Sequence, residues 1–345
     1  ILLDNIDTGN ASATNALIVN GQLLSVGSGS QWRLDASNYW TVSGSGDSLG
    51  ASPRAVAKID GAWTQVDANQ LRIADWLTDV DNYIKVYTSS VARHNGKWDE
   101  SKYRIIANNQ WYGVIDTRID YFTIDGLQIE NTYDDPVSSD ISGIRISDTQ
   151  GEVNISNNII RYTKTQDNLN ALIDSGIYFV SGGGDNMTVN VYNNIIYNYY
   201  HGIVRSYTSN NLFGIIANNT VYNSKYYGIE VRGSVDANNA RLMNNIAYNS
   251  GVEDYNLQAV KYTPRNISFD DTSPDPGFGS STLSFVSTAS GTEDFHLAEN
   301  DLVAINTGYD INATTSQFSL DIDGSPRNKA TLGCGSGRDR WNSDY

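Results

Sequence analysis

The sequence has 345 residues and a formal net charge of −16, with 18% of residues charged and a single cysteine. The negative charge argues against a nucleic-acid partner, which needs a basic surface, and the low charged fraction argues against a disordered acidic tail. One cysteine excludes an internal disulfide, and no apolar run reaches the roughly 18 residues needed to cross a membrane.

Residues 1–80 are predicted to form an aromatic-rich N-terminal cap and the first irregular coils of a solenoid. Six of the seven tryptophans precede residue 112: Trp32, Trp40, Trp63, Trp76, Trp98 and Trp111. A solenoid has to cover its open end, because exposed strand edges otherwise pair with other copies. Residues 82–88 alternate and are expected to be the first regular strand, with a projecting loop over 93–99. The start lacks Met, so we expect a processed or excised piece.

A repeat with a period near 25 dominates the middle of the chain. Asn-Asn pairs begin at residues 157, 193, 218 and 244, which lie 36, 25 and 26 residues apart. Gly-Ile or Gly-Val pairs begin at 113, 143, 176, 202 and 228. Three short apolar alternations fit into each period, and no helical periodicity competes with them. The sequence therefore predicts an all-β, right-handed parallel β-helix with three-strand coils over residues 81–262.

Stacked coils place equivalent residues above one another, about 4.8 Å apart. Alternation puts Ile144, Ile177 and Ile229 inside, while Arg145, Tyr178 and Glu230 point out. Arg205 breaks this rule, because it falls where an apolar residue is expected; either the register slips there or Arg205 lies near a coil end. Asn158, Asn194, Asn219 and Asn245 are expected to pair their amides in a ladder that is part of the scaffold.

Residues 263–345 depart from the repeat and are predicted to form the last coils and a closing cap. Three motifs mark this region: Asp294-Phe295-His296-Leu297, Ala304-Ile305-Asn306-Thr307-Gly308 and Asp321-Ile322-Asp323-Gly324-Ser325-Pro326-Arg327. With the Ile124-Asp125-Gly126-Leu127 coil and the Asn-Asn coils, they resemble the pectin-lyase-like right-handed parallel β-helix proteins, in particular uncharacterised secreted bacterial members. The segment 81–99 is similar to β-helix proteins of phage and environmental viruses. This fold carries lyases, hydrolases, epimerases, adhesins and phage tail proteins, so the resemblance predicts the fold and leaves the function open.

A basic strip is predicted on the coils between 193 and 234. Arg205, Lys225 and Arg232 face only Glu230 there, a local charge of +2, and His201 lies beside them. Tyrosines crowd the same coils, and tyrosine rings cover sugar faces at low entropic cost. We therefore predict contact with a glycan through Tyr178, Tyr199, Tyr200, Tyr226 and Glu230. The alternative is that these are ordinary outward residues of a β-sheet, in which tyrosine is favoured.

Catalysis and metal binding are weighed separately. A glycoside hydrolase needs two carboxylates at a defined separation, and no such pair is evident in the central coils. A polysaccharide lyase needs a cation and a base, for which His201, Arg205, Lys225 and Arg232 are the candidates. Calcium could bind Asp134, Asp135 and Asp140 in one inserted loop, or Asp79 and Asp81, but we favour the interpretation that these are solvated turn acids.

Two functional hypotheses follow from the sequence. The first is a non-catalytic β-helix protein that contacts polysaccharide or cell-surface glycans as a phage spike, decoration protein or adhesin. Its expected location is extracellular, on a cell surface or on a virion, without membrane insertion, as a homo-oligomer or part of a larger particle. The second is a secreted polysaccharide lyase acting on an acidic polysaccharide, with Ca²⁺ as a possible cofactor.

Overall fold

A computed structural model describes residues 55–324 with gaps, together with three short strands nearer the N-terminus. The gaps are residues 110, 135–140, 148, 165–173, 181–186, 206–211, 233–239, 259–263, 306 and 310–319. The early strands are β1 (Ala16–Val19), β2 (Gln22–Ser25) and β3 (Leu34–Asp35). Among the described residues there is no helix, and therefore none long and apolar enough to cross a membrane.

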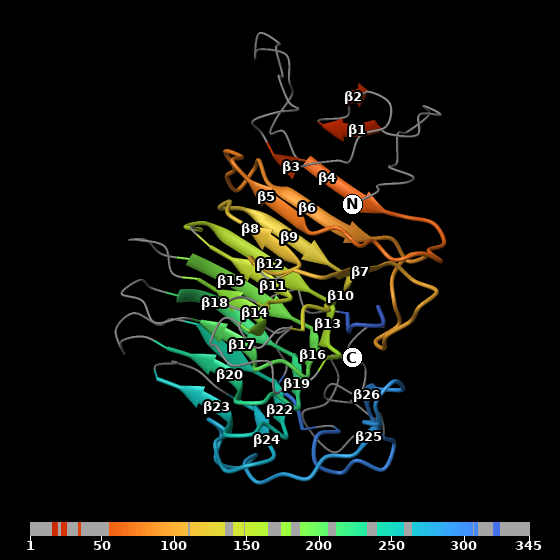
Figure 1. Cartoon of the computed structure of the whole chain (residues 1–345). Coiled ribbons are helices and arrows are strands. Elements are labelled where there is room, and N and C mark those ends of the chain that lie inside the picture. The colour runs from red at the N-terminus through yellow and green to blue at the C-terminus, as the bar shows by residue number, and fades with distance from the viewer. Residues whose placement is uncertain are drawn as a thin grey trace.

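Three sheets, named A, B and C, run along the molecule (Figure 1). Between residues 84 and 257 the chain visits them in the order A, C, B on each coil. Sheet A continues beyond β1 and β2 with β4 (Ala55–Ile59), β6 (Ile84–Thr88), β9 (Phe122–Asp125), β12 (Glu152–Ser156), β15 (Met187–Tyr192), β18 (Leu212–Ala217) and β21 (Arg241–Met243). Sheet C contains β7 (Arg104–Ala107), β10 (Gln128–Asn131), β13 (Ile159–Tyr162), β16 (Ile195–Tyr197), β19 (Thr220–Tyr222), β22 (Ile246–Tyr248) and β24 (Ile267–Ser268).

Sheet B contains β3, β5 (Leu71–Ala74), β8 (Ile115–Thr117), β11 (Ile144–Ile146), β14 (Ser175–Phe179), β17 (His201–Arg205), β20 (Tyr227–Val231) and β23 (Glu253–Leu257). Neighbouring strands pair in parallel from β4 onward in sheet A and throughout sheets B and C. The predicted right-handed parallel β-helix of three-strand coils is confirmed.

Apolar residues of successive strands stack into columns that fill the interior. Ile144, Ile177 and Ile229 lie in register and are fully buried, as the alternation predicts. Arg205 aligns with Phe179 below and Val231 above, so the register does not slip at this coil. Arg205 therefore occupies an inward position, and its side chain is almost fully buried. This burial lowers the pKa of the guanidinium to about 10.

The asparagine ladder is confirmed and continues one coil further than predicted. Asn158 donates to Asn194 Oδ1, Asn194 to Asn219 and Asn219 to Asn245, each through Nδ2 at 3.0 Å. Asn245 Nδ2 in turn donates to Asn266 Oδ1 at 2.9 Å. The preceding asparagine of each pair, at 157, 193, 218 and 244, has φ of 54–55°, a left-handed conformation that asparagine tolerates. The pair thus supplies both the turn between sheets A and C and its hydrogen bonds.

Two expectations about the first coils are wrong. The regular stack begins at β4, which pairs in parallel with β6, so residues 82–88 are not its first strand. The segment 93–99 does not project, because His94 is buried and its Nε2 lies 2.9 Å from the carbonyl oxygen of Asn157. Trp98 packs beside Arg161, whose guanidinium lies 3.5 Å from the indole centroid.

The C-terminal region does more than end the stack of coils. Its strands β25 (Phe285–Ser287) and β26 (Asp294–Leu297) form an antiparallel pair. Phe295 and Leu297 pack on outward residues of sheet C, among them Ile195 and Tyr197. The carbonyl oxygen of Leu320 accepts from Asn193 Nδ2, several coils before the end of the stack. The region therefore covers the outer face of sheet C, and sheets A and B supply the remaining flanks (Figure 1).

Candidate functional site

The predicted basic strip on sheet B is largely internal. His201 and Glu230 are at most 1% exposed, and Arg205 is 5% exposed. Their positions follow from the register, which places His201 below Tyr227 and Glu230 between Val204 and Asn256. Of the four catalytic candidates, only Lys225 and Arg232 present part of their side chains at the surface.

The buried part of the strip forms a network centred on Glu230. Its Oε1 accepts from Arg232 Nε and from Asn256 Nδ2, and its Oε2 lies 3.2 Å from His201 Nδ1. Burial raises the pKa of Glu230, although Arg232 opposes the shift. Burial together with the charge of Arg232 lowers the pKa of His201 to about 3. His201 is therefore neutral at pH 7 and a weak base, which suits a structural network better than proton abstraction.

The tyrosines of the strip fall into two groups. Tyr199 is fully buried beside Tyr162, with ring centroids 5.8 Å apart, so its predicted contact with a glycan is wrong. Tyr178 is also buried. Tyr200 and Tyr226 are partly exposed and stack on each other at 5.2 Å, with Lys225 Nζ above the ring of Tyr200. Only this second group remains available to a ligand.

The calcium prediction involves residues of which only Asp134 is described; Asp135 and Asp140 lie outside the described residues. In the part of the chain that the structure describes, no three His, Cys, Asp or Glu side chains gather as metal ligands.

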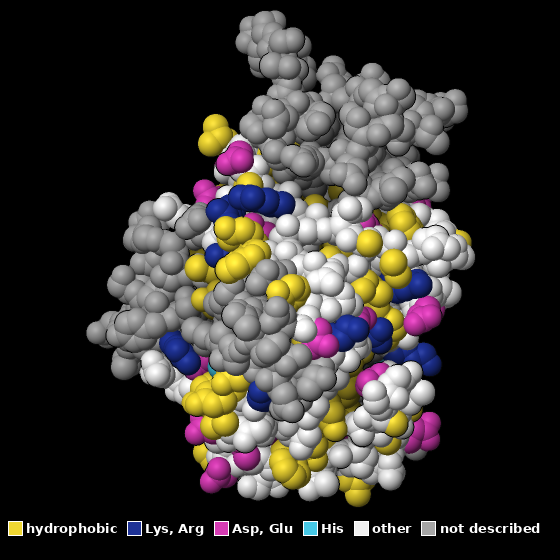
Figure 2. All heavy atoms as spheres, in the orientation of Figure 1, with side chains coloured by type: hydrophobic (Ala, Val, Ile, Leu, Met, Phe, Trp, Pro, Cys, Tyr) yellow, Lys and Arg dark blue, Asp and Glu magenta, His cyan; other side chains and the backbone are white. Residues whose placement is uncertain are grey.

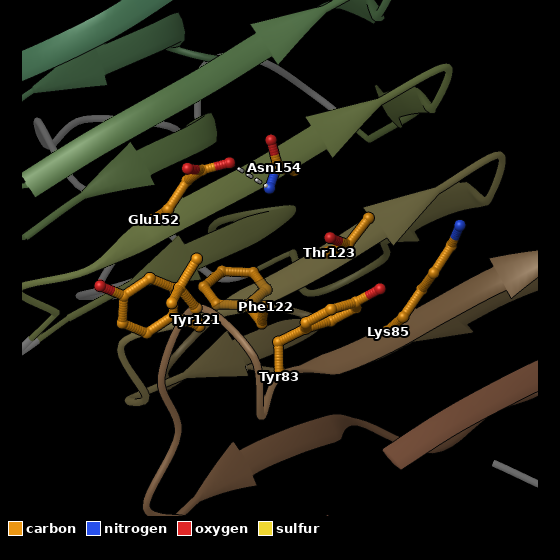
Figure 3. Close-up of a pocket in the computed structure, with 8 residues that line it drawn as sticks. Tyr83, Lys85, Tyr121, Phe122, Thr123, Glu152 and Asn154 are labelled. Atoms are coloured by element: carbon orange, nitrogen blue, oxygen red, sulfur yellow. Dashed lines mark hydrogen bonds between the residues drawn. The ribbon is translucent and has the colours of Figure 1, made fainter. Parts of the chain in front are cut away.

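A pocket of about 200 Å³ lies instead on the outer face of sheet A (Figure 3). Its lining residues occupy two equivalent positions on three successive coils. Tyr83, Tyr121 and Glu152 come just before the inward residues of β6, β9 and β12. Lys85, Thr123 and Asn154 are the next outward residues along the same strands.

Polar contacts order one side of this pocket. Asn154 Nδ2 donates to Glu152 Oε1 at 3.0 Å, and Asn190 on the next coil donates to the same oxygen at 3.2 Å. Asn190 also donates to Asn154 Oδ1. Figure 3 shows Glu152 and Asn154 on one strand facing the rings of Tyr121 and Tyr83 across the pocket. Apolar rings thus lie opposite a row of amide and carboxylate groups.

The turn before β6 forms the rim of the pocket. Asp79 Oδ1 accepts from the backbone N–H groups of Asp81 and Asn82, and its Oδ2 accepts from Asn82 Nδ2. Hydrogen bonds from the Asn82 side chain and backbone lower the pKa of Asp79. Thr78 Oγ1 accepts from the Tyr121 N–H at 3.1 Å, which ties this turn to the next coil. The exposed Val80 completes the rim.

This site was not predicted from the sequence, because basic residues and tyrosines gather on the coils between 193 and 234 instead. One signal was present: the alternation of residues 82–88 already places Tyr83, Lys85 and Tyr87 on one outward face. What the sequence alone could not show was that Tyr121 and Glu152 occupy the same position as Tyr83 on the next two coils, since insertions make the coils unequal in length.

Comparisons with protein-family models, with curated proteins and with solved structures each returned no match.

Proposed function

We propose that this protein is a non-catalytic β-helix of a cell or virion surface that binds a glycan in the sheet A pocket. The observation that carries the proposal is the pairing of Tyr83 and Tyr121 with the Glu152, Asn154 and Asn190 network. Sugar rings have apolar faces and hydroxyl edges, so a site for them needs aromatic surface opposite polar groups held in place.

The size and position of the pocket support the same proposal. Its residues span three coils, and two steps of about 4.8 Å make it roughly 10 Å long, comparable to a short stretch of a polysaccharide. It opens on a flank of the solenoid rather than at an end. A long chain can therefore lie across sheet A without threading into the molecule.

The chemistry of the site favours binding over cleavage. A retaining or inverting glycosidase uses two carboxyl groups, and Glu152 is the one carboxylate among the residues that line the pocket. Both Asn154 and Asn190 already donate to it. On the sheet B strip, His201 and Arg205, two of the four residues that a lyase would use, are buried.

The test compares the two flanks with matched tyrosine substitutions. Full-length protein, Tyr83→Ala, Tyr121→Ala and, as the control on sheet B, Tyr226→Ala are applied to a glycan array, and hits are titrated by calorimetry. We expect either pocket variant to weaken binding by about tenfold or more, the effect of losing one aromatic contact worth about 1.5 kcal/mol. The Tyr226→Ala variant should bind like the unmodified protein.

Two results would overturn the proposal. Loss of binding in Tyr226→Ala with retention in both pocket variants would move the site to the sheet B strip. A rise in absorbance at about 235 nm on incubation with uronate polysaccharides, the signature of an eliminated uronate, would show a lyase.

A further inference from the structure

A cluster of arginines surrounds one buried carboxylate on sheet B, three coils before β17. Asp116, in the middle of β8, is fully buried. Arg145 Nη1 on the next coil donates to its Oδ1 at 2.9 Å, and Arg118 Nε donates to its Oδ2 at 3.3 Å. Arg72 Nε on the preceding coil lies 3.7 Å from the same oxygen. Three guanidinium groups from three coils thus converge on one acid.

The three arginines of the cluster differ in how far their side chains are exposed to solvent. The side chain of Arg72 is 52% exposed, that of Arg118 28% and that of Arg145 14%. Within the described part of the chain, the Nη atoms of Arg72 and Arg118 donate to no protein acceptor. Figure 2 shows Lys and Arg side chains as a band at the level of β5 and β8. Closely spaced cations in a protein of net charge −16 favour an anionic ligand.

One aromatic ring lies against all three guanidinium groups. The ring centroid of Tyr112 is 5.8 Å from the Cζ of Arg72, 5.0 Å from that of Arg118 and 5.2 Å from that of Arg145. Tyr112 has φ of 72°, an unfavourable conformation for a tyrosine. Such strain persists only where the surroundings enforce it, and it gathers at ligand sites.

The loop that carries Tyr112 is held from both sides. Gln70 Nε2 donates to the carbonyl oxygens of Trp111 and Gly113, and Asn109 Nδ2 donates to that of Gly113 at 2.6 Å. Asn109 Oδ1 accepts from the Trp111 N–H. These bonds hold the backbone on both sides of Tyr112, and Trp111, the residue before it, is 52% exposed. A large exposed ring thus directly precedes, in the chain, the tyrosine that contacts the arginines.

We infer that Arg72, Arg118 and Arg145 bind an oxyanion substituent, a carboxylate or a sulfate, of a glycan whose sugar ring lies on Trp111. The inference rests on the proposed function for the identity of the ligand as a glycan, but it places a second contact on a different sheet. Asp116 and Tyr112 position the guanidinium groups, which supply the charge-assisted hydrogen bonds. Trp111 supplies the apolar surface.

The test reads Trp111 directly. The full chain is labelled with 5-fluorotryptophan, and its ¹⁹F resonance is assigned with Trp111→Phe. Glucuronate, glucose 6-sulfate and glucose are titrated at constant ionic strength into the protein, Arg72→Gln, Arg118→Gln and the control Arg241→Gln, which removes an exposed arginine elsewhere. Near-ultraviolet circular dichroism checks folding. Arg72→Gln keeps the test valid if Arg118→Gln is misfolded, since the Arg72 side chain is half exposed.

We expect the Trp111 resonance to shift saturably with one of the two anionic sugars and not with glucose, and the responding sugar identifies the substituent. Removing one arginine should weaken this binding by about tenfold or more, the effect of losing a hydrogen bond to a charged group, while Arg241→Gln leaves it unchanged. An unmoved resonance, an equal response to glucose, or an affinity that both arginine variants leave unchanged from the unmodified protein would overturn the inference. Because the Tyr83 and Tyr121 variants test the sheet A pocket separately, such a failure leaves the proposed function standing.

Discussion

The outer faces of sheets A and C are built on the same coils but meet different surroundings. On sheet C, one outward column carries Ile159, Ile195, Thr220, Ile246 and Ile267, and the C-terminal segment packs over it. On sheet A, an outward column carries Lys85, Thr123, Asn154 and Asn190 before it reaches Ile215, and a pocket lies open beside its first three residues.

The difference shows how one scaffold can cover one flank and leave another accessible. An apolar outward column has to be buried, and the chain uses its own C-terminal residues to bury it. A polar outward column with a few aromatic rings gains nothing from such a cover and stays accessible. The apolar content of an outward column therefore indicates whether that flank of a β-helix is covered or is available to a partner.

The largest expected effect comes from uncovering sheet C. Phe295 is 2% exposed and its ring lies 5.0 Å from those of both Tyr197 and Tyr222. Phe295→Ala should destabilise the C-terminal segment by about 3–5 kcal/mol, measured by urea unfolding, and should increase binding of a dye that recognises apolar surface. Val286→Ala is the control, because Val286 lies on the neighbouring strand with its side chain exposed. Equal stabilities of the two variants would contradict the assigned cover.

The asparagine ladder gives the next effect. Asn194 Oδ1 accepts from the N–H and the Nδ2 of Asn158, and its own Nδ2 donates to Asn219. Asn194→Ala leaves these buried groups without partners and should cost about 3 kcal/mol, since each unsatisfied group costs about 1–3 kcal/mol.

The matched control for the ladder is Asn223→Ala. Asn223 donates to Asn198 at 2.8 Å in a second ladder on the outside of the turn, where water can replace the lost bond. Asn223→Ala should lower the stability measured by thermal unfolding by well under half as much as Asn194→Ala does. Similar losses in the two variants would show that burial does not determine the value of a ladder.

The smallest effect is pH-dependent and lies at the cover itself. Burial opposes a charge on His296, but hydrogen bonds to Asp294 and Asp323 outweigh it and raise the pKa of His296 to about 10. Because the pKa of His296 is raised in the folded state, its charged form contributes its full stabilisation below the unfolded pKa of about 6.5. This stabilisation is lost as the pH rises to about 10. The melting temperature of wild type should exceed that of His296→Gln by a margin that shrinks between pH 6.5 and 10. A constant margin would show that packing, not charge, holds the segment.

The sequence by itself determined the repeat, the inward columns and the asparagine ladder, because these depend on local alternation and on identical residues recurring each coil. Spacing alone also placed Tyr83 and Lys85 on an outward face. Tertiary structure decided which outward residues reach solvent. Glu230 occupies a strand position typical of a surface, yet it is buried, and Phe295 covers Tyr197 from almost a hundred residues away in the chain. Alternation fixes the direction of a side chain relative to its own strand, whereas its exposure depends on distant segments that pack against that strand.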